Sequence, residues 1–294
     1  CRQVIDYAHA RGVQVILGFH WGWGLPLDLS NPEHRQWIKE DVLRNYRQHY
    51  RGLGMDGIYF QTLTEHNTMQ AGGKSTAAWA CEMVNEIAQA LYAEDPGLCI
   101  QFGLHATSIR DHYRDLAPLD PRVIIVWEDA GVIPYTYDPA PDSWVNVWDA
   151  VSSPEQTLEF SKHLATLRPG SEFALVPKGW TTLRWGEEFE HHGPYILGER
   201  EPAYIRRRLA ERQPRWDRVN TLWLQHYRHA VRFYREIRPL VPKMTATALV
   251  EDGLLEETIQ PSVALFAQTV WAPDRDDAEI LRKALNPYYR GGCL

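Results

Sequence analysis

Three acidic side chains closely follow short apolar runs of strand length, a position that suits acid–base chemistry. Glu65 comes after residues 57–62, and Glu128 and Asp129 come after residues 123–127. Cleavage of a glycosidic bond needs one carboxylic acid that protonates the leaving oxygen and a second carboxylate that attacks the sugar or activates water. Two carboxyl groups in differently polar surroundings can hold different pKa values and so divide these roles. The three residues are the catalytic candidates; a capping Glu65 and a salt-bridged strand end at Glu128 and Asp129 are the structural alternatives.

Aromatic and polar side chains accompany these acids after the predicted strands. A sugar ring stacks its apolar face on an aromatic plane, while its hydroxyl groups need directed polar partners. The substrate-binding candidates are His20, Trp21, Trp23, His66, Asn67, His105, Tyr135, Lys178, Trp180 and Trp185. Lys178 would suit an acidic sugar such as a uronic acid through charge-assisted hydrogen bonds, or would pair with Glu128 or Asp129. Taken singly, each tryptophan of this set is more often part of a core than a ligand platform.

Other catalytic chemistries have less support in the residue pattern. His20, His105, His191 and His192 could bind a metal together with the acids, but the His-x-His pattern of metal-dependent barrel hydrolases is absent. No metal and no cofactor is therefore expected, and a metal-dependent hydrolase is kept as an alternative. Acyl transfer is not favoured, because no Gly-x-Ser-x-Gly elbow occurs. Residues 71–75 contain Gly-Gly-Lys-Ser but lack the spacing and the preceding strand of a phosphate-binding loop.

The elements that would position these groups alternate along the first two-thirds of the chain. Apolar runs of strand length lie at residues 13–19, 57–62, 99–103, 123–127 and 173–176. Helical spacing is found at residues 32–50, 76–92 and 154–167. Strands that alternate with helices predict parallel βα units, and nearly continuous apolar strands predict a sheet covered on both faces. Later helices are expected at 201–238 and 276–285, with one more strand at 246–250.

The polar and aromatic candidates follow five successive predicted strands, which favours a barrel. In a barrel the carboxyl ends of all strands share one face, where active sites lie, whereas a doubly wound sheet concentrates its site at one switch point. The sequence therefore predicts an α/β fold of the TIM-type (β/α)8 class. Residues 2–11 already have a helical pattern that runs into a strand, so earlier units of the barrel are expected to precede this chain. The predicted division is a partial barrel at 1–200 and a mostly helical part at 201–294 that could include the last barrel strand.

Composition limits the partners of the chain. The 294 residues are 44% hydrophobic, enough for one large core or for a core with a helical appendage. No apolar run reaches the roughly 18 residues of a bilayer span, so no membrane partner is expected. A net charge of −7 argues against nucleic acid, which would need a basic face. Cys81 and Cys99 are expected to be buried thiols rather than a disulfide. Neither a compartment nor an oligomeric state follows.

Three stretches carry a resemblance to known enzymes. They are Gly-Phe-His-Trp-Gly-Trp at 18–23, Asp-Gly-Ile-Tyr-Phe-Gln-Thr-Leu-Thr-Glu-His at 56–66 and Val-Trp-Glu-Asp-Ala-Gly at 126–131. They resemble the barrel of α-glucuronidases and, more loosely, that of β-N-acetylhexosaminidases. The segment at 261–271 also resembles the helical region that follows such barrels.

The resemblance implies a glycoside hydrolase that acts on a carbohydrate, with an acidic or plant-type glycan as the expected substrate. It implies that Glu65 ends the fourth barrel strand and is the general acid, and that Glu128 or Asp129 is the base or its orienter. The Asp-Glu doublet of hexosaminidases is absent, because Thr64 precedes Glu65; this argues against substrate-assisted acetamido chemistry. A barrel that binds carbohydrate without cleaving it is the alternative from a different functional class.

Overall fold

The computed structural model describes residues 1–22, 25, 28–61, 63–64, 68–128, 133–135, 153–177, 179, 202–248 and 260–286. The chain forms two compact units. The first contains residues 1–129, 163–175 and 241–245, and the second contains residues 130–162, 176–240 and 246–294. Each unit therefore combines several stretches of the chain.

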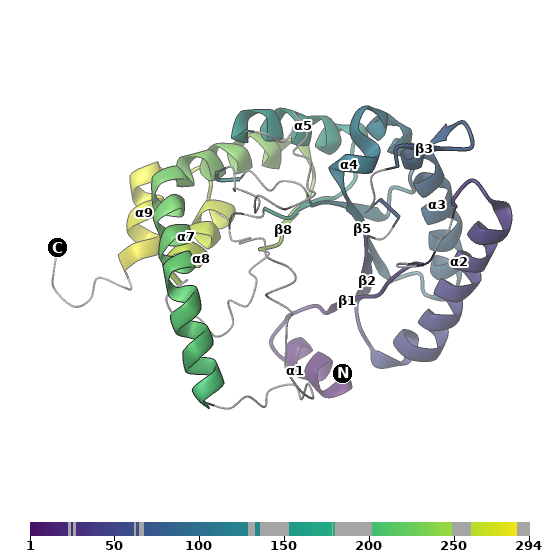
Figure 1. Cartoon of the computed structure of the whole chain (residues 1–294), viewed down its shortest axis with the longest axis horizontal. Coiled ribbons are helices and arrows are strands. Elements are labelled where there is room, and N and C mark those ends of the chain that lie inside the picture. Colours follow the sequence, from purple (N-terminus) through teal and green to yellow (C-terminus); the bar gives the residue numbers. More distant parts are fainter. Residues whose placement is uncertain are drawn as a thin grey trace. The chain divides into compact units, whose positions relative to one another are not determined.

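A curled six-stranded sheet organises the first unit (Figure 1), with its strands in the order β1-β2-β5-β6-β7-β8. The strands are β1 (Ile16–Gly18), β2 (Gly57–Phe60), β5 (Cys99–Leu104), β6 (Val123–Trp127), β7 (Phe173–Leu175) and β8 (Met244–Ala246). The pairs β1–β2, β2–β5, β5–β6 and β6–β7 are all parallel. This confirms an α/β fold built from parallel βα units, and the curl of the sheet is compatible with part of a barrel.

The strand register sorts the side chains of this sheet onto two faces. Phe60 lies opposite Phe102 on the neighbouring strand, and their rings stack with centroids 5.2 Å apart. Both rings are almost completely buried, so this face forms the hydrophobic core. Because side chains alternate along a strand, Tyr59 and Gly103 belong to the opposite face. That opposite face carries the polar residues described below.

Helices precede and connect the strands of the first unit. They are α1 (Arg2–His9), α2 (Pro32–Asn45), α3 (Thr76–Glu94) and the short α4 (Ala106–Ile109), which a 3-10 helix η3 (Arg110–Leu116) continues. Asn31 caps α2, because its side chain accepts a hydrogen bond of 2.8 Å from the Glu33 N–H. Ser75 caps α3 in the same way through the Ala78 N–H at 3.0 Å. Before α3, the strands β3 (Gln70–Ala71) and β4 (Lys74–Ser75) form a hairpin.

Helices dominate the described part of the second unit, as the sequence predicts for its end. They are α7 (Pro202–Ile237), α8 (Gln260–Trp271) and α9 (Asp277–Leu285), together with most of α5 (Pro154–Leu167). Arg235 of α7 holds the segment between α8 and α9, because its guanidinium donates to the carbonyls of Pro273 and Arg275 at 2.5 Å. The same guanidinium pairs with Asp277 at 2.7 Å. Among the described helices, none is long and apolar enough to span a bilayer.

Candidate active site

Glu128 and His105 meet at the carboxyl ends of two adjacent strands of the first unit. Nε2 of His105 lies 3.2 Å from Oε2 of Glu128, and these side chains are only 18% and 9% exposed. The Glu128 N–H donates to the Leu104 carbonyl at 3.1 Å and so continues the pairing of β5 with β6. The structure thus brings together two of the residues that the sequence predicts for the site.

The strand register explains why these two side chains meet. Leu104, the last residue of β5, pairs with Trp127, the last residue of β6. His105 and Glu128 are the next residues on their strands, so both project to the face opposite the core. A protonated imidazole this close to a largely buried carboxylate stabilises the carboxylate by charge attraction. This arrangement suits a carboxyl group that reacts while held in one orientation.

Gly103 allows further polar groups to approach Glu128. A Cβ atom at Gly103 would lie 2.8 Å from Oε1 of Glu128, 2.5 Å from the Tyr59 hydroxyl oxygen and 2.7 Å from Cβ of Gln61. Such distances are too short for real Cβ contacts, so only glycine fits between these three side chains. The Tyr59 hydroxyl donates to Oε1 of Gln61 at 2.7 Å. Tyr59 and Gln61 are thus functional candidates that the sequence reasoning missed, and their alternation with Phe60 is the only signal for them.

Thr64 anchors the chain between the end of β2 and the predicted catalytic residue Glu65. Its hydroxyl donates to the Gly103 carbonyl at 3.2 Å and accepts from the His105 N–H at 3.1 Å. Its own carbonyl accepts a hydrogen bond of 2.5 Å from the Ser108 hydroxyl. Thr64 is completely buried, so the residue directly before Glu65 is tied to the end of β5. Eight predicted site residues lie outside the described residues: Trp23, Glu65, His66, Asn67, Asp129, Lys178, Trp180 and Trp185.

His20 and Trp21, both predicted to bind substrate, have different surroundings. His20 is exposed. Trp21 is only 1% exposed, and its ring stacks on Phe60 with centroids 3.4 Å apart and planes 7° apart. Because Phe60 belongs to the core face, Trp21 contributes to the packing of that face and presents no accessible surface to a sugar. The physical reason is the gain from burying a large aromatic ring against other rings.

Tyr135, another predicted binding residue, belongs to the second unit. Its side chain is buried, and its hydroxyl donates to the Gly179 carbonyl. Nε1 of Trp223 on α7 donates to the same carbonyl at 3.1 Å. Burial raises the pKa of the Tyr135 hydroxyl, so this group is a neutral hydrogen-bond donor at ordinary pH. Tyr135 therefore holds the backbone at Gly179, and no sequence signal distinguished Trp223 within its long helix.

Neither a metal-binding group among the described residues nor a similar known protein indicates what this site does. Within the part of the chain that the structure describes, no group of three or more His, Cys, Asp or Glu side chains is placed to hold a metal ion. Cys81 and Cys99 are free thiols, and burial raises the pKa of Cys81 to about 11. No protein-family model matches the chain, and no curated protein matches it either. The function is therefore inferred from the geometry and chemistry of the residues.

Proposed function

We propose that the protein is a glycoside hydrolase in which Glu128 is one of two catalytic carboxyl groups. The observation that carries the proposal is the largely buried Glu128, paired with His105 at 3.2 Å beside Tyr59 and Gln61 at a strand end. Active sites of parallel barrels lie at this end of the strands. A carboxylate held by an imidazole, with a phenol and an amide nearby, supplies both a reactive group and hydrogen-bonding groups for sugar hydroxyls.

The proposed reaction divides the work between Glu128 and Glu65. Glu65 protonates the leaving glycosidic oxygen as the bond from that oxygen to the anomeric carbon breaks. Glu128 either attacks the anomeric carbon or takes a proton from the water that does so. The assignment of Glu65 comes from its place after a predicted strand and from the resemblance to α-glucuronidases. His105 orients the Glu128 carboxylate and is a positioning residue.

We also propose that the curled sheet is part of a complete (β/α)8 barrel. The registered strand pairs are parallel and the sheet is curled, which a barrel requires (Figure 1). β1 is the first strand in the sheet order, and it leaves one edge of the described sheet open. Val4, Tyr7 and Val13, which precede β1, are large apolar side chains exposed to solvent. Further βα units that pair with β1 would close the barrel and cover these side chains.

A panel of 4-nitrophenyl glycosides, including glucuronides, tests the proposal directly. We expect release of nitrophenol from at least one member, and a Glu65→Gln variant is expected to lose about 10²–10⁴-fold in rate, the typical contribution of general acid catalysis. Glu86→Gln is the matched control, because Glu86 is a largely exposed carboxylate on α3. Near-normal turnover by Glu65→Gln would remove Glu65 from the mechanism.

Two further measurements separate the alternatives. A barrel that binds carbohydrate without cleaving it would bind glycans yet release no product during long incubation. A metal-dependent hydrolase would lose its activity on treatment with a chelator and regain it when metal is returned. Either result would replace the two-carboxylate mechanism.

A further inference from the structure

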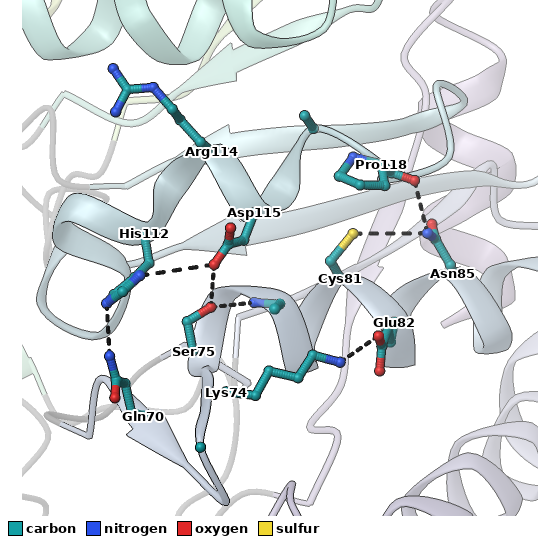
Figure 2. Close-up of a pocket in the computed structure, with 13 residues that line it drawn as sticks. Gln70, Lys74, Ser75, Cys81, Glu82, Asn85, His112, Arg114, Asp115 and Pro118 are labelled. Atoms are coloured by element: carbon teal, nitrogen blue, oxygen red, sulfur yellow. Dashed lines mark hydrogen bonds and ion pairs between the residues drawn. The ribbon is translucent and has the colours of Figure 1, made fainter.

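A cavity lies in the first unit, between the β3–β4 hairpin, α3 and η3 (Figure 2). Its volume is about 630 Å³, within the range of about 300–1,000 Å³ that is usual for small-molecule sites. The polar side chains at the hairpin end are Gln70, Ser75, His112 and Asp115. Nothing in the proposed reaction uses these groups.

Hydrogen bonds among these side chains fix their positions. Ser75 donates to Oδ2 of Asp115 at 2.5 Å, and Nδ1 of His112 lies 3.9 Å from the same oxygen. The Gln70 amide and Nε2 of His112 are 3.2 Å apart. The side chains of His112 and Asp115 are still 35% and 44% exposed, so each has free surface for a ligand. Figure 2 shows Gln70, His112, Asp115 and Ser75 gathered at one end of the cavity.

The charges that line the cavity favour a neutral polar ligand. Lys74 forms an ion pair with Glu82 across the first turns of α3. Arg114 points away from the group around Asp115 (Figure 2). The lining therefore presents no concentrated charge of either sign. It offers amide, imidazole, hydroxyl and carboxylate groups, which together donate to and accept from sugar hydroxyls.

The chain connectivity places this cavity on the same loops as the candidate active site. The segment after β2 includes the anchored Thr64 and reaches Gln70 six residues later. Its far end is tied to α3, because the Thr76 hydroxyl donates to the Thr68 carbonyl at 2.6 Å. The segment after β5 begins at His105 and reaches His112 through α4 and η3. His112 thus follows His105 by seven residues along the chain.

We propose that this cavity is an outer subsite that binds a neutral sugar unit of an oligosaccharide whose scissile bond lies at Glu128. The inference rests on the proposed function and specifies its substrate class as an oligosaccharide rather than a small glycoside. Gln70, His112 and Asp115 supply the hydrogen bonds to the sugar, and Ser75 holds the Asp115 carboxylate.

The test compares substrates of different length in the full chain. kcat/KM is measured for the 4-nitrophenyl glycosides of glucuronic acid, glucose, xylose and mannose, and for cello-, xylo- and manno-oligosaccharides of two to six units. The variants are Gln70→Ala and His112→Ala, which each remove a hydrogen-bonding group, and Ala117→Trp, which fills the cavity from its exposed rim. His49→Ala is the matched control, because His49 is an exposed histidine on another helix.

We expect each cavity variant to lower kcat/KM about threefold to tenfold for the longer oligosaccharides, the effect of one lost hydrogen bond or a blocked contact. The same variants are expected to leave the nitrophenyl glycosides unchanged, and His49→Ala to leave both unchanged. Equal effects on short and long substrates, or no effect on either, would overturn the subsite and leave the proposed hydrolysis standing.

Failure of the proposed function gives a different result. If the wild-type protein cleaves none of these compounds, binding of the hexasaccharides is measured by saturation-transfer NMR with the wild-type and Ala117→Trp proteins. Binding that Ala117→Trp abolishes would support the cavity as a sugar site even though hydrolysis had failed. Binding that is absent, or that persists unchanged in Ala117→Trp, would overturn the subsite as well.

Discussion

His105 and Glu128 lie side by side, because each is the first residue after the paired ends of two neighbouring strands. Neither side chain is more than a fifth exposed, so water competes weakly for the contact between them. Tyr59 and Gln61 lie on the same face, and Gly103 provides the space in which they approach Glu128. The proposed chemistry of the site therefore depends on the short distances between Glu128 and these neighbouring side chains.

Replacement of His105 tests its positioning role. His105→Ala is expected to lower kcat about 10- to 100-fold with little change in KM, because it removes the imidazole that lies 3.2 Å from the reacting Glu128 carboxylate and orients it. His105→Gln keeps a side-chain donor and is expected to recover part of that loss. Steady-state kinetics and thermal unfolding of both variants check this; a fall in melting temperature without a change in kcat would show a purely structural role.

Gly103 offers a second test at the residue scale. Gly103→Ala is expected to lower activity more than tenfold and stability by about 1–3 kcal/mol, because its Cβ would collide with Tyr59 and Glu128. Gly52→Ala is the control, since a Cβ there meets nothing within 4 Å. Rates and denaturant midpoints for the two variants are compared. Similar behaviour of the two would contradict the crowded site described around Gly103.

At the scale of elements, Asp56 joins the amino ends of three strands. Its carboxylate accepts hydrogen bonds from the Val15 N–H at 2.6 Å and from Nε2 of His9 at 2.8 Å. Its backbone pairs with Val15 and with Cys99, which lie at the starts of β1 and β5. The Val15 N–H, and after it His9, hold the pKa of the Asp56 carboxyl below its usual range.

Asp56→Asn is therefore expected to destabilise the protein by about 1–3 kcal/mol at pH 7, through loss of hydrogen bonds to a charged group. A carboxyl whose folded-state pKa is depressed contributes stability above its unfolded pKa of about 3.9 and loses it as the pH falls through the folded value. The difference between wild type and variant should thus shrink below about pH 4. Urea unfolding from pH 3 to pH 7 measures it, with the exposed Asp111→Asn as control; a difference independent of pH would contradict this role.

Much of the element pattern could be predicted from the sequence. Apolar runs and helical spacing placed α2, α3, α5 and β6 at or near their observed bounds. The first strand was predicted at 13–19, and the assigned strand β1 is shorter, Ile16–Gly18, although the backbones of Val15 and Phe19 also form hydrogen bonds to Asp56 and Tyr59. The site was predicted where polar residues follow strands, as for His105 and Glu128. Tyr59, Gln61 and Gly103 were missed, because the register between strands decides which residues of neighbouring strands meet.

At the scale of the whole molecule, the net charge of the chain limits which kinds of polymer it can bind. The net charge of −7 is spread over a chain with 31 basic and 38 acidic residues, so neither cationic nor anionic polymers are favoured as general partners. We propose a polyhydroxylated substrate, in keeping with the polar groups that line the described cavity.

The most direct measurement is the rate of glycoside hydrolysis by Glu128→Gln beside wild type and Glu86→Gln. The amide preserves the shape of the side chain but can neither attack the sugar nor accept a proton from water. We predict that Glu128→Gln loses about 10²–10⁴-fold in kcat while its fold and the rate of Glu86→Gln are unchanged. Hydrolysis by a folded Glu128→Gln protein at close to the wild-type rate would contradict the account.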